Sequence, residues 1–114
     1  MHRQCTSAGI DFELIVLDDH STDTAVLHTN RAINHLEHCR MEESPENNGV
    51  ARTRNLLASM AHGDTLLFLD ADVYPTTPRF VSDYLALAAT SDVVCGGHTY
   101  RTDGVRPLSP LRYR

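Results

Sequence analysis

Two carboxylates separated by one residue, Asp70 and Asp72, directly follow the apolar run 66–69. Carboxylates at positions i and i+2 near the end of a strand can converge on one divalent cation. Hard oxygen ligands suit Mg²⁺ or Mn²⁺, and these ions keep positions open for water or for the phosphates of a substrate. Because the apolar run should hold Asp70 at the edge of the core, we expect a Mn²⁺ or Mg²⁺ site here rather than two solvated loop acids.

A second acidic cluster, Asp18-Asp19-His20-Ser21-Thr22-Asp23, follows the apolar run 12–17. Adjacent carboxylates raise each other's pKa unless something neutralises them or donates to them. We therefore expect one of Asp18 and Asp19 to accept a hydrogen bond from a ligand N–H, and the other to be held by backbone amides. Ser21 and Asp23 are expected to cap the helix that follows.

The third cluster covers residues 48–55 and reads Asn-Gly-Val-Ala-Arg-Thr-Arg-Asn. Gly49 gives the backbone the freedom to turn in front of a helix. Arg52 and Arg54 then place two guanidinium groups early on that helix, where they can bind phosphate or carboxylate. A turn followed by a solvated helix face is the alternative interpretation.

The elements that must position these clusters alternate between strands and helices. Helices are expected after Asp23 as far as His38, after Gly49 as far as Gly63, and over residues 80–88. Strands are expected at 12–17, 39–42, 65–69 and 92–95. This order predicts an α/β fold with three layers, in which helices flank a mainly parallel sheet. Ligands of such sheets bind at the carboxyl ends of the strands, where the acidic clusters lie. Residues 1–11 and 101–114 are predicted to be loop or disordered.

The amino-acid composition excludes several classes of function. A chain of 114 residues, 41% of them hydrophobic, fits one domain. All ten basic residues are arginine against fifteen acidic ones, and the net charge of -5 argues against a nucleic-acid partner. The absence of lysine excludes a P-loop lysine and Schiff-base chemistry. Three scattered cysteines, no secretory signal and no apolar run of about 20 residues predict a cytoplasmic protein, with docking at a membrane surface left open.

Taken together and in this order, the three clusters resemble the family 2 inverting glycosyltransferases. Residues 12–23 (FELIVLDDHSTD) are similar to the family segment FEIIVVDDGSTD. Residues 48–55 are similar to NxGxxxARN, and residues 63–72 to GDxIxFLDADD. The resemblance runs from about residue 12 to residue 97. It implies the GT-A type of fold, a Rossmann-like fold that binds nucleotide-diphosphate sugars.

The resemblance also implies roles for single residues. Asp19, with Asp18 beside it, would accept the N–H of the nucleotide base, and Arg54 would contact the nucleotide. Asp70 and Ala71 would lie at the ribose or sugar, and Asp72 would bind the Mn²⁺ or Mg²⁺ that bridges the diphosphate. The implied donor is a nucleotide-diphosphate sugar, with the UDP type favoured, and the implied acceptor is an unidentified glycan or lipid-linked molecule.

The sequence departs from the family pattern in three respects. His20 stands where the family usually has Gly or Asn. The first strand of the family, expected before residue 12, has no counterpart, and neither has the acceptor half that supplies the catalytic base. We therefore expect residues 1–114 to form a single, truncated donor-binding domain whose catalytic base lies outside the chain.

Two other functions remain open from the sequence. The first is a non-catalytic nucleotide-binding or interaction module, in which unpaired strand edges would promote self-association. The second is a phosphatase of the haloacid-dehalogenase type, because residues 67–72 also resemble its nucleophile strand, although the later lysine of that family has no candidate here.

Overall fold

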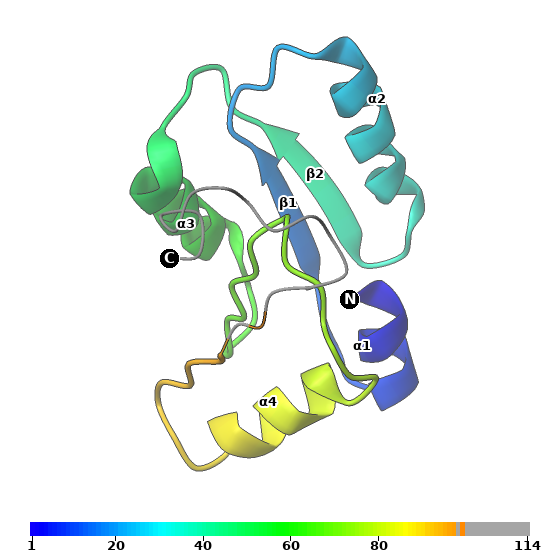
Figure 1. Ribbon diagram of the computed structural model, residues 1–114, viewed down its shortest axis with the longest axis vertical. Helices are drawn as coiled ribbons and strands as arrows, with labels where there is room; N and C mark the ends of the chain where they lie inside the picture. The colour runs from blue at the N-terminus through cyan, green and yellow to red at the C-terminus, as the bar shows by residue number, and fades with distance from the viewer. Residues whose placement is uncertain (98, 100–114) are drawn as a thin grey trace, which may run out of the picture.

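The computed structural model describes residues 1–97 and 99 of the chain (Figure 1). Two parallel strands run through the middle of the molecule, and helices flank them. This is a partial α/β fold. The elements are, in order, α1 (His2–Ala8), β1 (Leu14–Asp18), α2 (Thr24–Arg31), the 3₁₀ turn η1 (Ala32–His35), β2 (Cys39–Glu43), α3 (Gly49–Met60) and α4 (Phe80–Ala88).

The sheet consists of β1 and β2, which pair in parallel from Leu14 opposite Cys39 to Asp18 opposite Glu43. Helix α2 and η1 make the crossover that parallel strands require. Since both strands run in the same direction and end together, Asp18 and Glu43 lie at the same end of the sheet. The predicted strands at 12–17 and 39–42 are confirmed, each shifted by one or two residues.

Helix α2 begins where the sequence predicts a cap. Asp23 has an extended backbone, and its carboxylate accepts the N–H groups of Ala25 at 2.8 Å and of Val26 at 3.4 Å. These bonds satisfy two of the N–H groups that a helix start leaves without partners. Ser21, the other predicted cap, instead donates its backbone N–H to Asp18.

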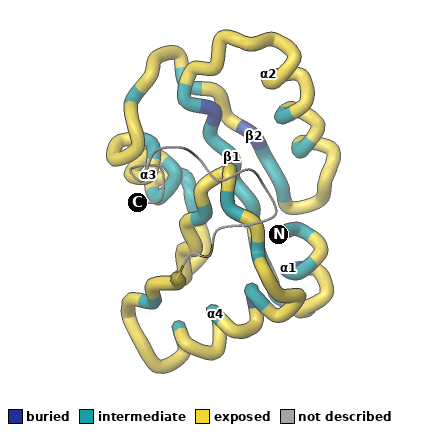
Figure 2. Tube along the Cα trace, viewed as in Figure 1, coloured by how far each residue is buried: buried dark blue, intermediate teal, exposed yellow. Residues whose placement is uncertain are grey.

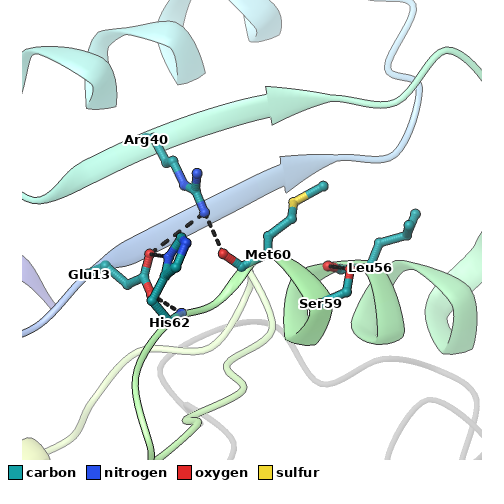
Figure 3. A network of polar contacts seen from close by, with 6 residues as sticks. All are labelled: Glu13, Arg40, Leu56, Ser59, Met60 and His62. Carbon is teal, nitrogen blue, oxygen red and sulfur yellow. Dashed lines mark hydrogen bonds and ion pairs between the residues drawn. The ribbon is translucent and has the colours of Figure 1, made fainter.

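Helix α3 is anchored at its C-terminal end to the start of β1 (Figure 3). Arg40, on β2, donates to the carbonyl of Met60 at 2.7 Å and lies 3.6 Å from the Glu13 carboxylate. The same carboxylate accepts the backbone N–H of His62, and these contacts lower the pKa of Glu13, with the His62 N–H as the largest cause. The helix ends at Met60 rather than near Gly63, because Ala61 is already extended.

Two of the predicted strands are absent from the part of the chain that the structure describes. Residues 65–69 and 92–95 are mostly apolar but pair with no neighbouring strand. Leu66, Leu67 and Phe68 consequently remain 46%, 41% and 43% exposed. An apolar run predicts burial, but a strand also needs a hydrogen-bonded partner, and β1 pairs with β2 alone.

The prediction of loop or disorder for residues 1–11 is wrong for most of that segment, because residues 2–8 form α1. The helix buries Cys5, and burial raises the pKa of the Cys5 thiol. The side chain of Gln4 ties α1 to α4: it donates to the Thr77 carbonyl at 3.0 Å and accepts the Val81 N–H at 3.2 Å. The prediction for residues 101–114 lies outside the described residues.

Burial within the described residues is slight. The buried hydrophobic side chains are those of Cys5, Met41 and Val81, and Asp18 is the buried charged residue. Figure 2 shows half-buried strands surrounded by largely exposed helices. Nothing in the described part of the chain forms a helix long and apolar enough to cross a membrane.

Candidate functional site

A hollow of about 410 Å³ opens at the carboxyl end of β1. It is lined by residues 19–23 together with Val26 and Asn47. The acidic cluster 18–23 therefore follows the carboxyl end of β1, the end of a parallel strand at which α/β sheets bind their ligands.

Asp18 ends β1 and is only 8% exposed. Its Oδ1 accepts the backbone N–H of Ser21 at 2.7 Å, and this bond closes the turn that leads toward α2. A buried carboxylate requires such a partner, because an unpaired one is costly. In this structure Asp18 therefore shapes the turn beneath the hollow.

Asp19 holds the start of α3. Its Oδ1 accepts the backbone N–H of Asn48 at 2.8 Å and the Asn48 side-chain amide at 3.1 Å, and its Oδ2 accepts the Gly49 N–H at 2.8 Å. These donors, with the Asn48 backbone N–H as the largest cause, lower the pKa of Asp19. An ionised carboxylate has about four acceptor positions, and these donors occupy three of them, while the Thr53 side chain lies close enough to lower the pKa of Asp19 further.

His20 occupies a backbone position that favours glycine. Its φ is +71°, in the left-handed region, and the residue lines the hollow. Glycine adopts this conformation freely, whereas an L-residue is strained in it, although histidine tolerates it better than most. The family that the sequence resembles usually has Gly or Asn at this position, and both residues adopt a positive φ readily.

Two predicted site residues that are 16 positions apart meet in an ion pair. Arg54 Nη2, on α3, donates to Asp70 Oδ1 at 2.7 Å, with side chains that are 48% and 57% exposed. Asp70 is thus exposed and paired, not held at the edge of the core as the sequence predicted. Its carbonyl accepts the Val73 N–H at 3.1 Å in a tight turn that carries Ala71 and Asp72, both exposed.

The acidic turn carries the carboxylate of Asp72, which is exposed. Among the described residues, no three His, Cys, Asp or Glu side chains gather so that they could hold a metal ion. Mg²⁺ and similar ions often bind through one or two carboxylates, with waters and substrate phosphates completing the shell. The exposed carboxylate of Asp72 fits this arrangement.

Asn48 is a site residue to which the sequence assigned no role. Both its backbone and its side chain donate to Asp19, and the side chain also donates to the Ser44 hydroxyl at 2.6 Å. The sequence signal that could have identified Asn48 is its position immediately before Gly49, at the start of a helix.

Comparisons with known proteins define the class of this chain. The profile of Glycosyl transferase family 2 matches residues 2–113, nearly the whole sequence, and the chain belongs to that family. An uncharacterized glycosyltransferase of Haemophilus influenzae is 37% identical over 62 residues, which are 54% of this chain and 25% of the relative. The match thus spans about a quarter of that protein's length. No solved structure matches the chain.

Proposed function

We propose that this chain binds the nucleotide-diphosphate-sugar donor of a glycosyltransferase. The observation that carries the proposal is that side-chain contacts join all three family motifs. Asp19 of the first motif holds Asn48 and Gly49 of the second, and Arg54 of the second holds Asp70 of the third. Family membership supports sugar transfer over the phosphatase alternative.

Within this proposal each element of the site has a task. Asp19 accepts the N–H of the nucleotide base, and the hollow beside it takes the base itself. Asp70 and Ala71 face the ribose or sugar. Asp72 holds Mn²⁺ or Mg²⁺ on the diphosphate, and the cation supplies positive charge that stabilises the leaving diphosphate.

We further propose that the donor is of the UDP type, and that a glycan or lipid-linked acceptor receives the sugar. Inverting transfer needs a base within hydrogen-bond reach of the acceptor hydroxyl, and we place this base outside the residues of the donor site. The proposed place of action is the cytoplasm, at the membrane surface if the acceptor is lipid-linked.

Calorimetric titration with UDP and Mn²⁺ tests donor binding. We expect the folded chain to bind Mn²⁺·UDP, and Asp72→Asn to weaken binding by about 10-fold or more, because that substitution removes a charged metal ligand. Asp92→Asn, a change at an exposed acid outside all three motifs, is the control and should bind as the wild type does. No heat from a folded wild-type sample with any nucleoside diphosphate would contradict the proposal.

A second candidate function, an interaction module, is favoured by the outer edge of β1. Alternate residues of a parallel strand point to opposite neighbours, and Leu14 and Asp18 bond toward β2. The backbone groups of Ile15 and Leu17 therefore face the other way, where none of the described residues provides a backbone partner. We propose that a second copy of the chain pairs with this edge.

Light scattering after size exclusion tests the second candidate. We expect a dimer that Ile15→Pro dissociates, because this change removes an outward-facing N–H and spares the bonds to β2. A wild-type chain that stays monomeric at high concentration would exclude it.

A further inference from the structure

We propose that Arg54 is a positioning residue for the acidic turn, and that through its ion pair with Asp70 it fixes the turn on α3 so that Asp72 can reach the cation. This inference rests on the proposed donor-binding function. It assigns Arg54 a task that acts through Asp70, whereas the family resemblance implies a direct contact with the nucleotide.

The first step of the inference concerns the segment that carries the acids. Residues 61–79, between α3 and α4, contain no helix or strand. The turn around Ala71 is closed by a single backbone bond, from Val73 N–H to the Asp70 carbonyl. Such a segment has few contacts of its own to hold a carboxylate at a fixed place, so an outside contact must do so.

The Arg54–Asp70 ion pair is that contact. Within residues 1–97 and 99, it is the hydrogen bond that links a side chain of the turn 70–73 to another element. Its length of 2.7 Å is typical of a charge-assisted bond, which is shorter and stronger than a neutral one. Movement of Arg54 would therefore move Asp70, and with it Asp72 two residues later.

Helix α3 is a suitable base for this contact because both of its ends are anchored. At its start, Asp19 accepts the N–H groups of Asn48 and Gly49. At its end, Arg40 donates to the carbonyl of Met60, as Figure 3 shows. The helix thereby fixes Arg54 relative to β1 and to the hollow at the end of β1.

Two arginines outside the three motifs serve as controls for Arg54. Arg3 has the same charge and is exposed on α1. Arg31, on α2, makes an ion pair with Glu43 at 2.6 Å. Arg3→Gln tests the loss of a positive charge, and Arg31→Gln tests the loss of a surface ion pair.

The experiment measures calorimetric binding of Mn²⁺·UDP, and urea unfolding, for the wild type, Arg54→Gln, Asp70→Asn, their double variant and the two controls. We expect Arg54→Gln to weaken binding by about 10-fold, the usual scale for residues that orient a metal ligand. The urea midpoint should hardly change, because exposed ion pairs contribute little to stability. Both controls should bind within about 2-fold of the wild type.

The double variant separates positioning from direct contact. If Arg54 acts through Asp70, the double variant should bind no more weakly than Asp70→Asn alone. Fully additive losses would show that Arg54 contacts the nucleotide itself, and would overturn the inference. Arg54→Gln binding as tightly as Arg3→Gln would overturn it too, while donor binding by the wild type would stand. Absence of binding by the folded wild type would remove the proposed function and this inference together.

Discussion

Replacement of Gly49 by alanine tests whether the start of α3 depends on a left-handed backbone. Gly49 has a φ of +71°, and an added Cβ would meet no atom of the described residues within 4 Å. The substitution therefore adds no clash, and the Gly49 N–H that donates to Asp19 is retained. Its whole cost lies in the backbone conformation.

The size of this cost follows from two opposing effects. An L-residue in the left-handed region costs about 1–2 kcal/mol. Alanine also reduces the conformational freedom of the unfolded chain, and this effect offsets about 0.4–1 kcal/mol of that cost. We expect a net loss of about 1 kcal/mol in the free energy of unfolding, or roughly 5 °C in Tm for a chain of this size.

Urea unfolding followed by circular dichroism measures this loss, provided that the slope m is unchanged. Gly97→Ala is the matched control, because among the described residues an added Cβ at Gly97 also meets nothing within 4 Å, whereas the backbone φ there is not positive. The control should stay within about 0.5 kcal/mol of the wild type. Equal stability of the two alanine variants would refute the reasoning.

Three further predictions concern the sheet end and the carboxylates. Asp23→Ala should lower the free energy of unfolding by about 1 kcal/mol through loss of the α2 cap, and an unchanged urea midpoint would contradict the assigned cap. His20→Gly should raise it by about 0.5–1 kcal/mol, because the φ of +71° no longer strains a side-chain-bearing residue; a lower midpoint would show that the His20 side chain stabilises the fold. The folded-state pKa values of Glu13, Asp19 and Glu43 are lowered. Their contribution is therefore complete above the ordinary carboxyl pKa of about 4 and is lost as the pH falls through the lowered values. Urea midpoints measured from pH 6 to pH 3 should decline below about pH 4, and Asp19→Asn should decline less than the wild type.

The sequence predicts the elements that local chemistry determines. The cap at Asp23, the turn at Gly49 and the apolar run of β1 each specify their element through neighbouring residues, and the structure confirms all three. Strand β2 has only a weak apolar pattern. It forms because, after the crossover, it pairs in parallel with β1.

The predictions that failed, a strand at residues 65–69 and a loop at residues 1–11, concern segments whose structure depends on distant partners. Residues 65–69 have the composition of a strand, but a strand forms only against a neighbour. Helix α1 has no apolar periodicity, and its tie to α4 through Gln4 spans more than 70 residues. No local pattern reports such contacts.

For the candidate site too, the sequence predicts which residues belong to it but not the contacts that they make. Sequence patterns identified Asp19, Arg54 and Asp70, because each belongs to a motif. They could not show that Asp19 already accepts three N–H donors, or that Arg54 and Asp70 are paired. The first fact depends on how α3 sits against β1, and the second depends on how the segment 61–79 folds back toward α3.

Calorimetric titration of the folded chain with Mn²⁺·UDP, run in parallel on Asp72→Asn, tests the central claim most directly. Donor binding predicts a saturable heat for the wild type that requires Mn²⁺, and a loss of affinity of about 10-fold or more for Asp72→Asn. Binding of equal strength in the two proteins, or no binding by the wild type, would contradict it.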